Sequence, residues 1–242
     1  MTHYPFPDSR GTKIAFAAFF TAMLFLARDS MFTTAVIGFE KAQFLMLGVI
    51  CLLGVAFLIV NRRNLLQILK DRRMIVAGIA AAVLLLPMLV KRDWQLMYFS
   101  VLLCLLTAVF LSYFLTLRDA AKYYVVIMSV LGAYSVLAAY ILRIGVDSGA
   151  YAVPVFQNSM GFEFHNFFLS IVPDTYVKNR NFGIFREPGV YQFFLITALY
   201  LNNYEVEWKK TWQLWLVNGI LAATMVSTFA TCLLYTSDAA DD

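Results

Sequence analysis

The sequence predicts an all-α fold: a polytopic transmembrane helical protein with about seven spans. The first observation behind this prediction is composition. Of the 242 residues, 61% are hydrophobic and only 14% are charged, with a mean hydropathy of +0.72, whereas soluble domains carry roughly 25% charged residues. The second is that long charge-free stretches recur along the chain. Each can cross about 30 Å of hydrocarbon as a helix of about 20 residues, because a helix bonds its own backbone groups internally.

Six of the expected spans are clear charge-free stretches, at 42–60, 74–90, 94–117, 123–142, 188–204 and 212–231. A shorter stretch, 14–27, is expected to belong to the first span. Arg10 and Lys13 precede it, as basic residues precede the core of a signal peptide. The following "FLARDS" offers no small-x-small cleavage site, so an uncleaved span is favoured over a signal peptide.

The basic residues predict the orientation, because loops rich in Lys and Arg stay in the cytoplasm. The segment "NRRNLLQILKDRR" (61–73), between the second and third expected spans, carries the strongest cluster. We therefore expect a cytoplasmic N-terminus and a long outward loop from about 143 to 187. The net charge of +4 reflects this loop bias and does not indicate nucleic-acid binding.

One transmembrane domain is expected over 1–231, without a soluble domain. The last eleven residues, "CLLYTSDAADD" (232–242), interrupt an apolar helix with three aspartates. Written back as codons, they match a transposase-type sequencing-library adapter. We expect 232–242 to be a non-native tail and the native chain to continue beyond Thr231.

Several classes of function lack their signature in this sequence. Cys51 and Cys104 lie inside expected spans, where a small buried hydrophobe is the usual role, and no metal-type spacing or disulfide framework occurs. Neither a hydrolase triad nor a phosphate-cradling glycine loop is found. The six clear spans contain no ionisable Asp, Glu, Lys, Arg or His, which disfavours a proton or ion relay. No cofactor, metal or nucleic-acid partner is therefore expected.

Charges gather instead on "VKNRNFGIFREPGVYQ" (177–192), next to an apolar stretch. Glu187 precedes Pro188, and because proline suits the first position of a helix, the outward loop is expected to enter a helix there. Arg186 and Glu187 then lie at the water–lipid boundary beside a helix N-terminus, which favours anions. An arginine can fork two hydrogen bonds onto a phosphate, so the site suits a lipid-linked phosphate. In the structural alternative, Arg186 snorkels to lipid headgroups and Glu187 caps its helix.

Arg180 adds a second cation, but its distance from Arg186 limits what the two can do together. Six extended residues cover roughly 20 Å, which is too far for both arginines to hold one diphosphate unless Gly183 turns the chain. Without such a turn, one arginine binds phosphate and the other serves a sugar or pairs with Glu187.

The outward loop also contains "FEFHNFFLSIV" (162–172), which is either an interfacial helix or a strand, because its periodicity fits both. His165 within it is a candidate acid or base. Its apolar flanks favour an ordinary interfacial residue.

The order "RNFGIFREPG" (180–189) resembles the R-x-x-G-x-F-x-E-P signature of the O-antigen polymerase and ligase superfamily, close to the exopolysaccharide and capsule polymerases. The matching positions are Arg180, Gly183, Phe185, Glu187 and Pro188. "STFAT" (227–231) also resembles the start of the S-T-x-S-T-x-G stretch in the family's following helix.

The resemblance implies a metal-independent membrane glycosyltransferase with the helical C-type architecture. Because the family's large second outer loop is absent from this sequence, the resemblance also implies that this fragment alone is inactive. It implies polymerisation of oligosaccharide repeat units linked to undecaprenyl diphosphate, at the outer face of the bacterial inner membrane, in O-antigen, capsule or exopolysaccharide synthesis. Chain-length regulator and flippase proteins are the implied partners, besides the bilayer. Among the matching positions, Arg180, Gly183 and Glu187 are the implied substrate-binding residues, and Glu187 is also the candidate catalytic residue. Arg186 joins the expected substrate-binding set because of its position at the helix start.

Two alternatives stay open. An O-antigen ligase would transfer the glycan to lipid A-core, although Glu187 beside proline favours a polymerase. A polysaccharide or lipid transporter or flippase is the alternative from another class, and it would place polar residues along a pathway within the spans.

Overall fold

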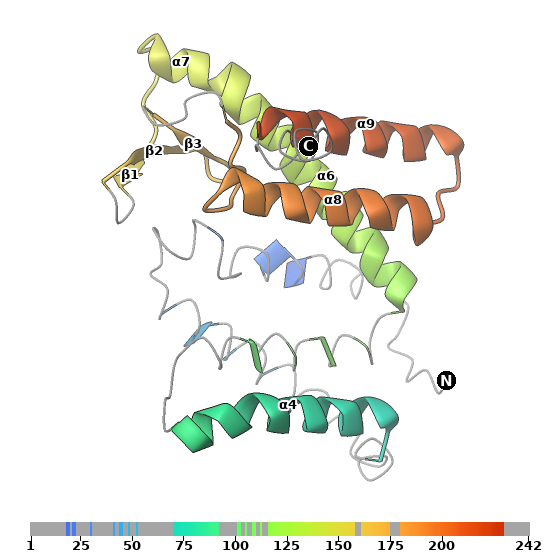
Figure 1. Ribbon diagram of the computed structural model, residues 1–242. Coiled ribbons are helices and arrows are strands. Elements are labelled where there is room, and N and C mark those ends of the chain that lie inside the picture. Colours follow the sequence, from blue (N-terminus) through green and yellow to red (C-terminus); the bar gives the residue numbers. More distant parts are fainter. Residues whose placement is uncertain are drawn as a thin grey trace, which may run out of the picture. The chain divides into compact units, whose positions relative to one another are not determined.

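The computed structural model describes residues 70–91, 116–157, 161–174 and 180–229, together with isolated positions before residue 116 (Figure 1). The chain divides into two compact units. The first comprises Met1–Thr12 and Glu40–Thr116, and the second comprises Lys13–Phe39 and Leu117–Asp242. The expected domain boundary at residue 231 lies outside the described residues.

The described helix of the first unit is α4 (Arg72–Lys91), which contains the expected span 74–90. It begins directly after Asp71, whose carboxylate accepts a hydrogen bond of 2.9 Å from the Arg73 amide. Asp71 thereby satisfies one of the amides that lack a partner at a helix start. The apolar sequence that follows then continues as a helix, with Pro87 inside it.

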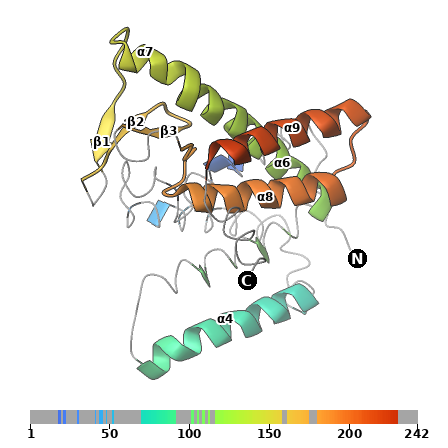
Figure 2. The same cartoon turned by 45° about the horizontal axis from the view of Figure 1, so that its top comes forward.

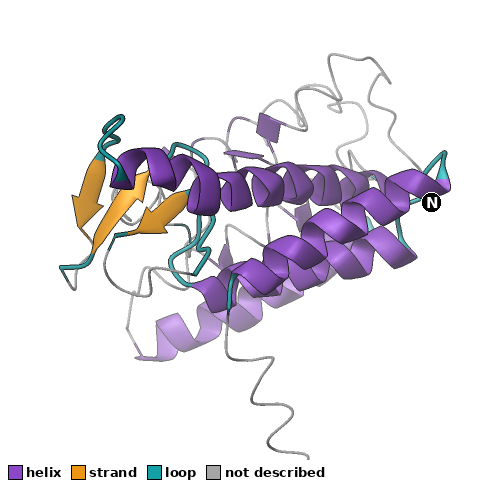
Figure 3. Ribbon diagram, turned by 90° about the horizontal axis from the view of Figure 1, so that it is seen from above, coloured by secondary structure: helices purple, strands orange, loops and turns teal. Residues whose placement is uncertain are grey.

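The second unit is built on three helical rods. The first is a continuous helix formed by α6 (Leu117–Leu137), a five-residue π-helix η3 (Ala138–Leu142) and α7 (Arg143–Asp147). The others are α8 (Pro188–Tyr204) and α9 (Thr211–Ser227), which run side by side in opposite directions, while α6 packs against both (Figure 1 and Figure 3). The start of α8 at Pro188 confirms the prediction from its position after Glu187.

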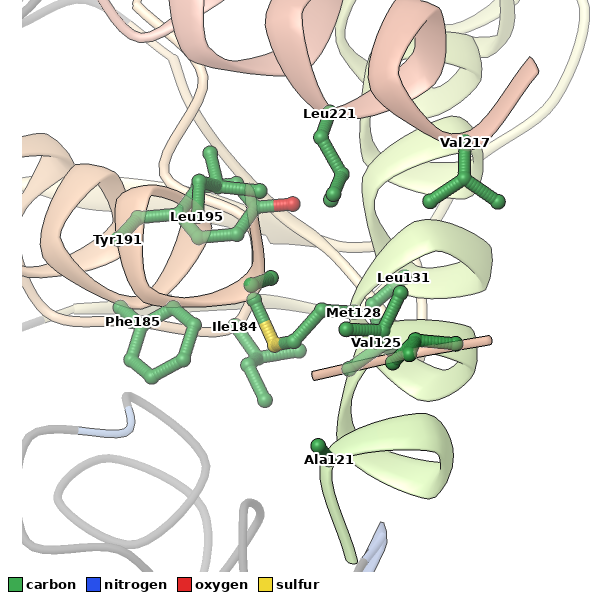
Figure 4. Packing of buried hydrophobic residues seen from close by; sticks show 12 residues of the cluster. Ala121, Val125, Met128, Leu131, Ile184, Phe185, Tyr191, Leu195, Val217 and Leu221 are labelled. Carbon is green, nitrogen blue, oxygen red and sulfur yellow. The ribbon is translucent and has the colours of Figure 1, made fainter. Parts of the chain in front are cut away.

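The three rods bury one continuous apolar core (Figure 4). α6 contributes residues spaced three or four apart, which places them on one face of the helix. Side chains from α8, α9 and the loop before α8 fill the space opposite. The residues labelled in Figure 4 are Ala121, Val125, Met128 and Leu131 of α6, Ile184 and Phe185 of the loop, Tyr191 and Leu195 of α8, and Val217 and Leu221 of α9. α6 and α9 approach closely at Gly132, where a Cβ would lie 2.8 Å from the Thr224 hydroxyl oxygen.

A small antiparallel sheet lies beside η3 and α7, at the end of the unit where α8 begins (Figure 2). Its strands are β1 (Val155–Gln157), β2 (Glu163–Asn166) and β3 (Ile171–Pro173), in the order β1-β2-β3. "FEFHNFFLSIV" is therefore a hairpin rather than an interfacial helix. Its two faces differ, because side chains alternate along a strand. Phe164 and Ile171 cluster with Phe182, whereas Val172 clusters with Ala138 and Ala139 of the π-helix.

The prediction of an all-α fold with about seven spans is wrong. The described residues contain a three-stranded sheet, and one continuous helix among them, Leu117–Asp147, is long and apolar enough to cross a membrane. The glycosyltransferase C-type architecture fails with that prediction. The reason is that an apolar stretch predicts burial but does not show whether it is buried in lipid or in protein. α8 and α9 are 17-residue helices that each bury one face against protein. The expected spans 14–27, 42–60 and 94–117 lie almost wholly outside the described residues.

The Leu117–Asp147 helix supports association with a membrane. By its length and composition it can cross a bilayer, and the core helix of a soluble protein passes the same test. It contains the expected span 123–142.

The core makes a prediction at α9. Leu221→Ala should lower the free energy of unfolding by about 2–5 kcal/mol, because Leu221 is 1% exposed and its removal leaves a cavity between the rods. The matched control is Leu216→Ala on the same helix, where the side chain is 53% exposed; this change should stay within about 0.5 kcal/mol. Denaturant unfolding followed by circular dichroism measures both, and equal losses would contradict the packing.

Candidate functional site

The segment 180–188 carries the candidate site and turns sharply at Gly183. The Phe185 amide donates a hydrogen bond of 3.0 Å to the Phe182 carbonyl, which closes a four-residue turn. Gly183 has a φ of +55°, a conformation that residues with a Cβ rarely adopt. A Cβ there would also lie 2.6 Å from Cε1 of Tyr191. The turn that two cooperating arginines require is therefore present, and glycine is needed there for two separate reasons.

Asn181 fastens this turn to the helical rods. Its side-chain Nδ2 donates to the hydroxyl oxygens of Ser135 on α6, at 2.8 Å, and Ser227 on α9, at 3.0 Å. Its Oδ1 accepts from the Gly183 amide at 2.9 Å, and its own amide donates to the Ser227 carbonyl at 3.0 Å. The residue is 1% exposed. We call this set of four hydrogen bonds the Asn181 clamp.

Tyr191 completes the buried polar junction from α8. Its hydroxyl lies 3.0 Å from the Ser135 hydroxyl, and its ring packs against Gly183 and, at 5.2 Å between centroids, against Phe185. The Tyr191 hydroxyl therefore links α8 to α6 through its hydrogen bond with Ser135.

Arg186 and Glu187 lie at the start of α8, as the sequence predicts. Their side chains are 53% and 60% exposed, and Arg186 Nε lies 3.4 Å from a Glu187 carboxylate oxygen. Glu187 occupies the N-cap position with an extended backbone, but its side chain makes no capping hydrogen bond within the described chain. Of the two predicted alternatives for Glu187, the ion pair with Arg186 is present and the cap is not.

The four predicted site residues thus divide between two environments. Gly183 is buried and shapes the turn, Arg180 is half-buried beside the Asn181 clamp, and Arg186 and Glu187 face outward at the helix start. Pro188 has no amide hydrogen and the Tyr191 amide bonds to the Glu187 carbonyl, so the Gly189 and Val190 amides are the ones without an intrahelical acceptor at this helix start. Arg186 adds a positive charge beside them, which its ion pair with Glu187 partly offsets. This arrangement can hold an anion such as a phosphate group.

His165 lies in β2, where the sheet meets the long helix. Its Nε2 is 3.3 Å from an Asp174 carboxylate oxygen, and the side chain is 12% exposed. Buried Arg143 on α7 donates through Nη2 to the Asp174 carbonyl at 3.2 Å and through Nε to Asp147 at 3.3 Å. His165 Nδ1 is buried and has no hydrogen-bond partner among the described residues. The histidine therefore lies inside a sheet–helix junction, away from the exposed position that an interfacial residue would take.

Sequence reasoning missed Asn181, Ser135, Arg143 and Asp174. Asn181 and Ser135 could have been found from the sequence, because an amide and a hydroxyl inside apolar surroundings must find hydrogen-bond partners. The contact between Arg143 and Asp174 could not, since only the packing of the hairpin on α7 brings these residues together.

A metal is not indicated by the geometry. Among the described residues, no group of three or more His, Cys, Asp or Glu side chains is placed to hold an ion.

Compared with known proteins, the chain matches no family model, no curated protein and no solved structure. The O-antigen polymerase and ligase resemblance therefore rests on the motif residues alone.

The turn makes a prediction at Gly183. Gly183→Ala should lower the free energy of unfolding by about 2–4 kcal/mol, because the new Cβ meets the Tyr191 ring and the positive φ is strained. Gly189→Ala is the matched control in the first turn of α8, where a Cβ has no described atom within 4 Å. That change should be neutral or stabilising, since alanine favours helices. Thermal unfolding of both variants tests this, and a tolerated Gly183→Ala would contradict the turn.

Proposed function

We propose that this protein is a membrane glycosyltransferase that polymerises oligosaccharide repeat units linked to undecaprenyl diphosphate, in O-antigen, capsule or exopolysaccharide synthesis. The observation that carries the proposal is the contact between the two stretches on which the family resemblance rests. Asn181, inside "RNFGIFREPG", bonds to both the hydroxyl and the carbonyl of Ser227, the first residue of "STFAT". Two separate sequence signatures therefore form one structural unit, as parts of one site do.

The chemistry of the site agrees with this reaction. An acceptor hydroxyl attacks the anomeric carbon while the lipid diphosphate leaves, so the leaving group gains negative charge. Cations and helix amides directed at that charge lower the barrier. Arg186 and the start of α8 supply them, and Arg180 is the second candidate cation. Glu187 is the candidate catalytic group, because an exposed carboxylate can accept the proton of the acceptor hydroxyl.

The proposed location is the bacterial inner membrane, with several passes, a cytoplasmic N-terminus and the candidate site on the outer side. The Leu117–Asp147 helix is about 46 Å long, which exceeds the roughly 30 Å of the hydrocarbon layer. Arg118 and Lys122 lie near its start and Arg143 near its end, on either side of the charge-free segment 123–142. Flippase and chain-length regulator proteins are the proposed partners.

A polysaccharide or lipid transporter or flippase is the competing class of function. An ion-coupled transporter requires Asp, Glu, Lys, Arg or His side chains along a pathway between helices. The segments 123–142, 188–204 and 212–227 contain none of these five residue types, which disfavours ion coupling.

The proposal predicts that Arg186 binds lipid diphosphate. In nanodiscs, Arg186→Ala should weaken binding of farnesyl diphosphate about tenfold or more, because a charge-assisted hydrogen bond is lost. Arg118→Ala is the matched control, since Arg118 is 60% exposed and is likewise paired with a glutamate, Glu207; binding should not change. Farnesol, which lacks the phosphates, should not bind. Equal affinities of both variants, or equal binding of farnesol, would contradict the proposal.

In cells, Arg186→Ala in the complete protein should also shorten the polysaccharide, whereas Arg118→Ala should not. Gel electrophoresis of the surface glycan measures chain length. Normal lengths in the Arg186→Ala strain would exclude a role for this arginine in polymerisation.

The proposed sidedness predicts how introduced cysteines react. In a background in which Cys51, Cys104 and Cys232 are changed to serine, Arg186→Cys should react with a membrane-impermeant maleimide added outside the inner membrane. Arg118→Cys, near the other end of the Leu117–Asp147 helix, should react only after the membrane is permeabilised. Labelling of both positions from the same side would refute the proposed orientation.

A further inference from the structure

We propose that Asn181 is a positioning residue for the anion site: it holds the backbone at Arg180 in place, so that Arg180 can bind a phosphate without first being ordered. This inference rests on the proposed function, in which Arg180 binds the diphosphate of a lipid-linked glycan. It assigns a role to Asn181, which lies between the motif positions Arg180 and Gly183 but is not itself a motif position.

The first observation is that the two donors and the oxygen acceptor of the Asn181 side chain all have hydrogen-bond partners. Both donors of its amide nitrogen are used, on the hydroxyls of Ser135 and Ser227, and its oxygen accepts from the Gly183 amide. Aspartate has an acceptor but no donors, and leucine has neither. The side chain is almost wholly buried, so a lost partner could not be replaced by bulk water.

The second observation is that the backbone of Asn181 is held as well. Its amide donates to the carbonyl of Ser227, the last residue of α9. Carbonyls at the end of a helix lack intrahelical partners, and this one also accepts from the Tyr140 hydroxyl at 3.4 Å. Arg180 is joined to Asn181 by a peptide bond, so its Cα is fixed relative to the ends of α6 and α9.

The third observation is that the clamp also sets the turn at Gly183. Asn181 Oδ1 holds the Gly183 amide, and the Gly183 carbonyl accepts from the Ile171 amide of β3 at 2.7 Å. The turn and the strand therefore both depend on the position of one amide side chain. A loop that is ordered in advance binds more tightly, because the cost of ordering is met on folding rather than on binding.

A purely structural role for Asn181 makes a different prediction. In that case its loss would destabilise the unit, and any effect on binding would be independent of Arg180. Asn202 provides the comparison at the other end of α8. It is fully buried, donates to Asn218 at 2.8 Å, and accepts from the Trp208 ring nitrogen at 2.7 Å. Asn202→Ala therefore removes a similar buried amide far along the helix from Arg180.

The test is a double-mutant cycle on the full chain in nanodiscs, with farnesyl diphosphate as the probe. Dissociation constants are measured for Arg180→Ala, Asn181→Ala and the double variant, at a temperature where circular dichroism shows all of them folded. Asn181→Ala should weaken binding about five- to thirtyfold, the cost of ordering one residue on binding. The double variant should bind within about twofold of Arg180→Ala, because Asn181 acts through Arg180.

The dependence on salt gives a second readout. Removal of the Arg180 charge should flatten the fall of affinity with added NaCl, because fewer charges are screened. Asn181→Ala removes no charge, yet it should flatten that curve in the same way. Asn202→Ala should lower the melting temperature without changing either the affinity or its dependence on salt.

Three results would overturn the inference: additive losses in the double variant, an unchanged salt dependence in Asn181→Ala, or equal weakening by Asn202→Ala. They leave the proposed function standing if Arg180→Ala alone weakens binding. If Arg180→Ala binds as the parent does, the assignment of phosphate binding to Arg180 fails first, and the role of Asn181 fails with it.

Discussion

The second unit of this protein depends on one constraint, which is that polar groups enclosed by apolar helices must bond to one another. Asn181, Ser135, Ser227 and Tyr191 meet where three helical rods come together, and each finds its partner there. An unsatisfied polar group in such surroundings costs more than a typical hydrogen bond contributes, so the junction specifies one arrangement of the rods. The loop that carries the candidate site is held in place by the same bonds.

This constraint connects the interior of the unit to its candidate site. The residues from Asn181 to Phe185 are buried, and the exposed residues Arg186 and Glu187 follow them directly in the sequence. The apolar core supports the turn through Tyr191, whose ring leaves no room for a side chain at Gly183. The exposed charges therefore follow directly on a turn that is held by buried contacts.

The hairpin adds a second junction, between β2, the end of β3 and α7. Arg143, Asp147, Asp174 and His165 gather there, with buried Arg143 bonded to both aspartates. Since the opposite face of the hairpin packs on Phe182, the sheet links this junction to the motif loop. His165, chosen as a candidate acid or base from its sequence position, is thus one member of this hydrogen-bonded junction.

Local sequence predicted the helices of the described chain well and the sheet poorly. The stretches at 74–90, 123–142 and 188–204 lie within or coincide with α4, the α6–α7 helix and α8, because charge-free runs of that length favour helices in any apolar environment. Pro188 was correctly placed at a helix start from its fixed φ and missing amide. "FEFHNFFLSIV" remained undecided, since its alternation and its apolar content fit two structures, and only pairing with β1 and packing on η3 select the strand.

The sequence by itself determined the apolar character of the chain, the start of a helix at Pro188 and the charges beside it, whereas the turn at Gly183 stayed one of two alternatives until the tertiary structure showed it. It could not determine whether an apolar helix faces lipid or protein, because hydropathy is the same in both cases, and the expectation of seven spans failed for that reason. Only the tertiary structure brought Asn181 to Ser135 and Ser227, residues 46 positions away on either side. Such contacts depend on where whole helices pack, and no local pattern of residues encodes them.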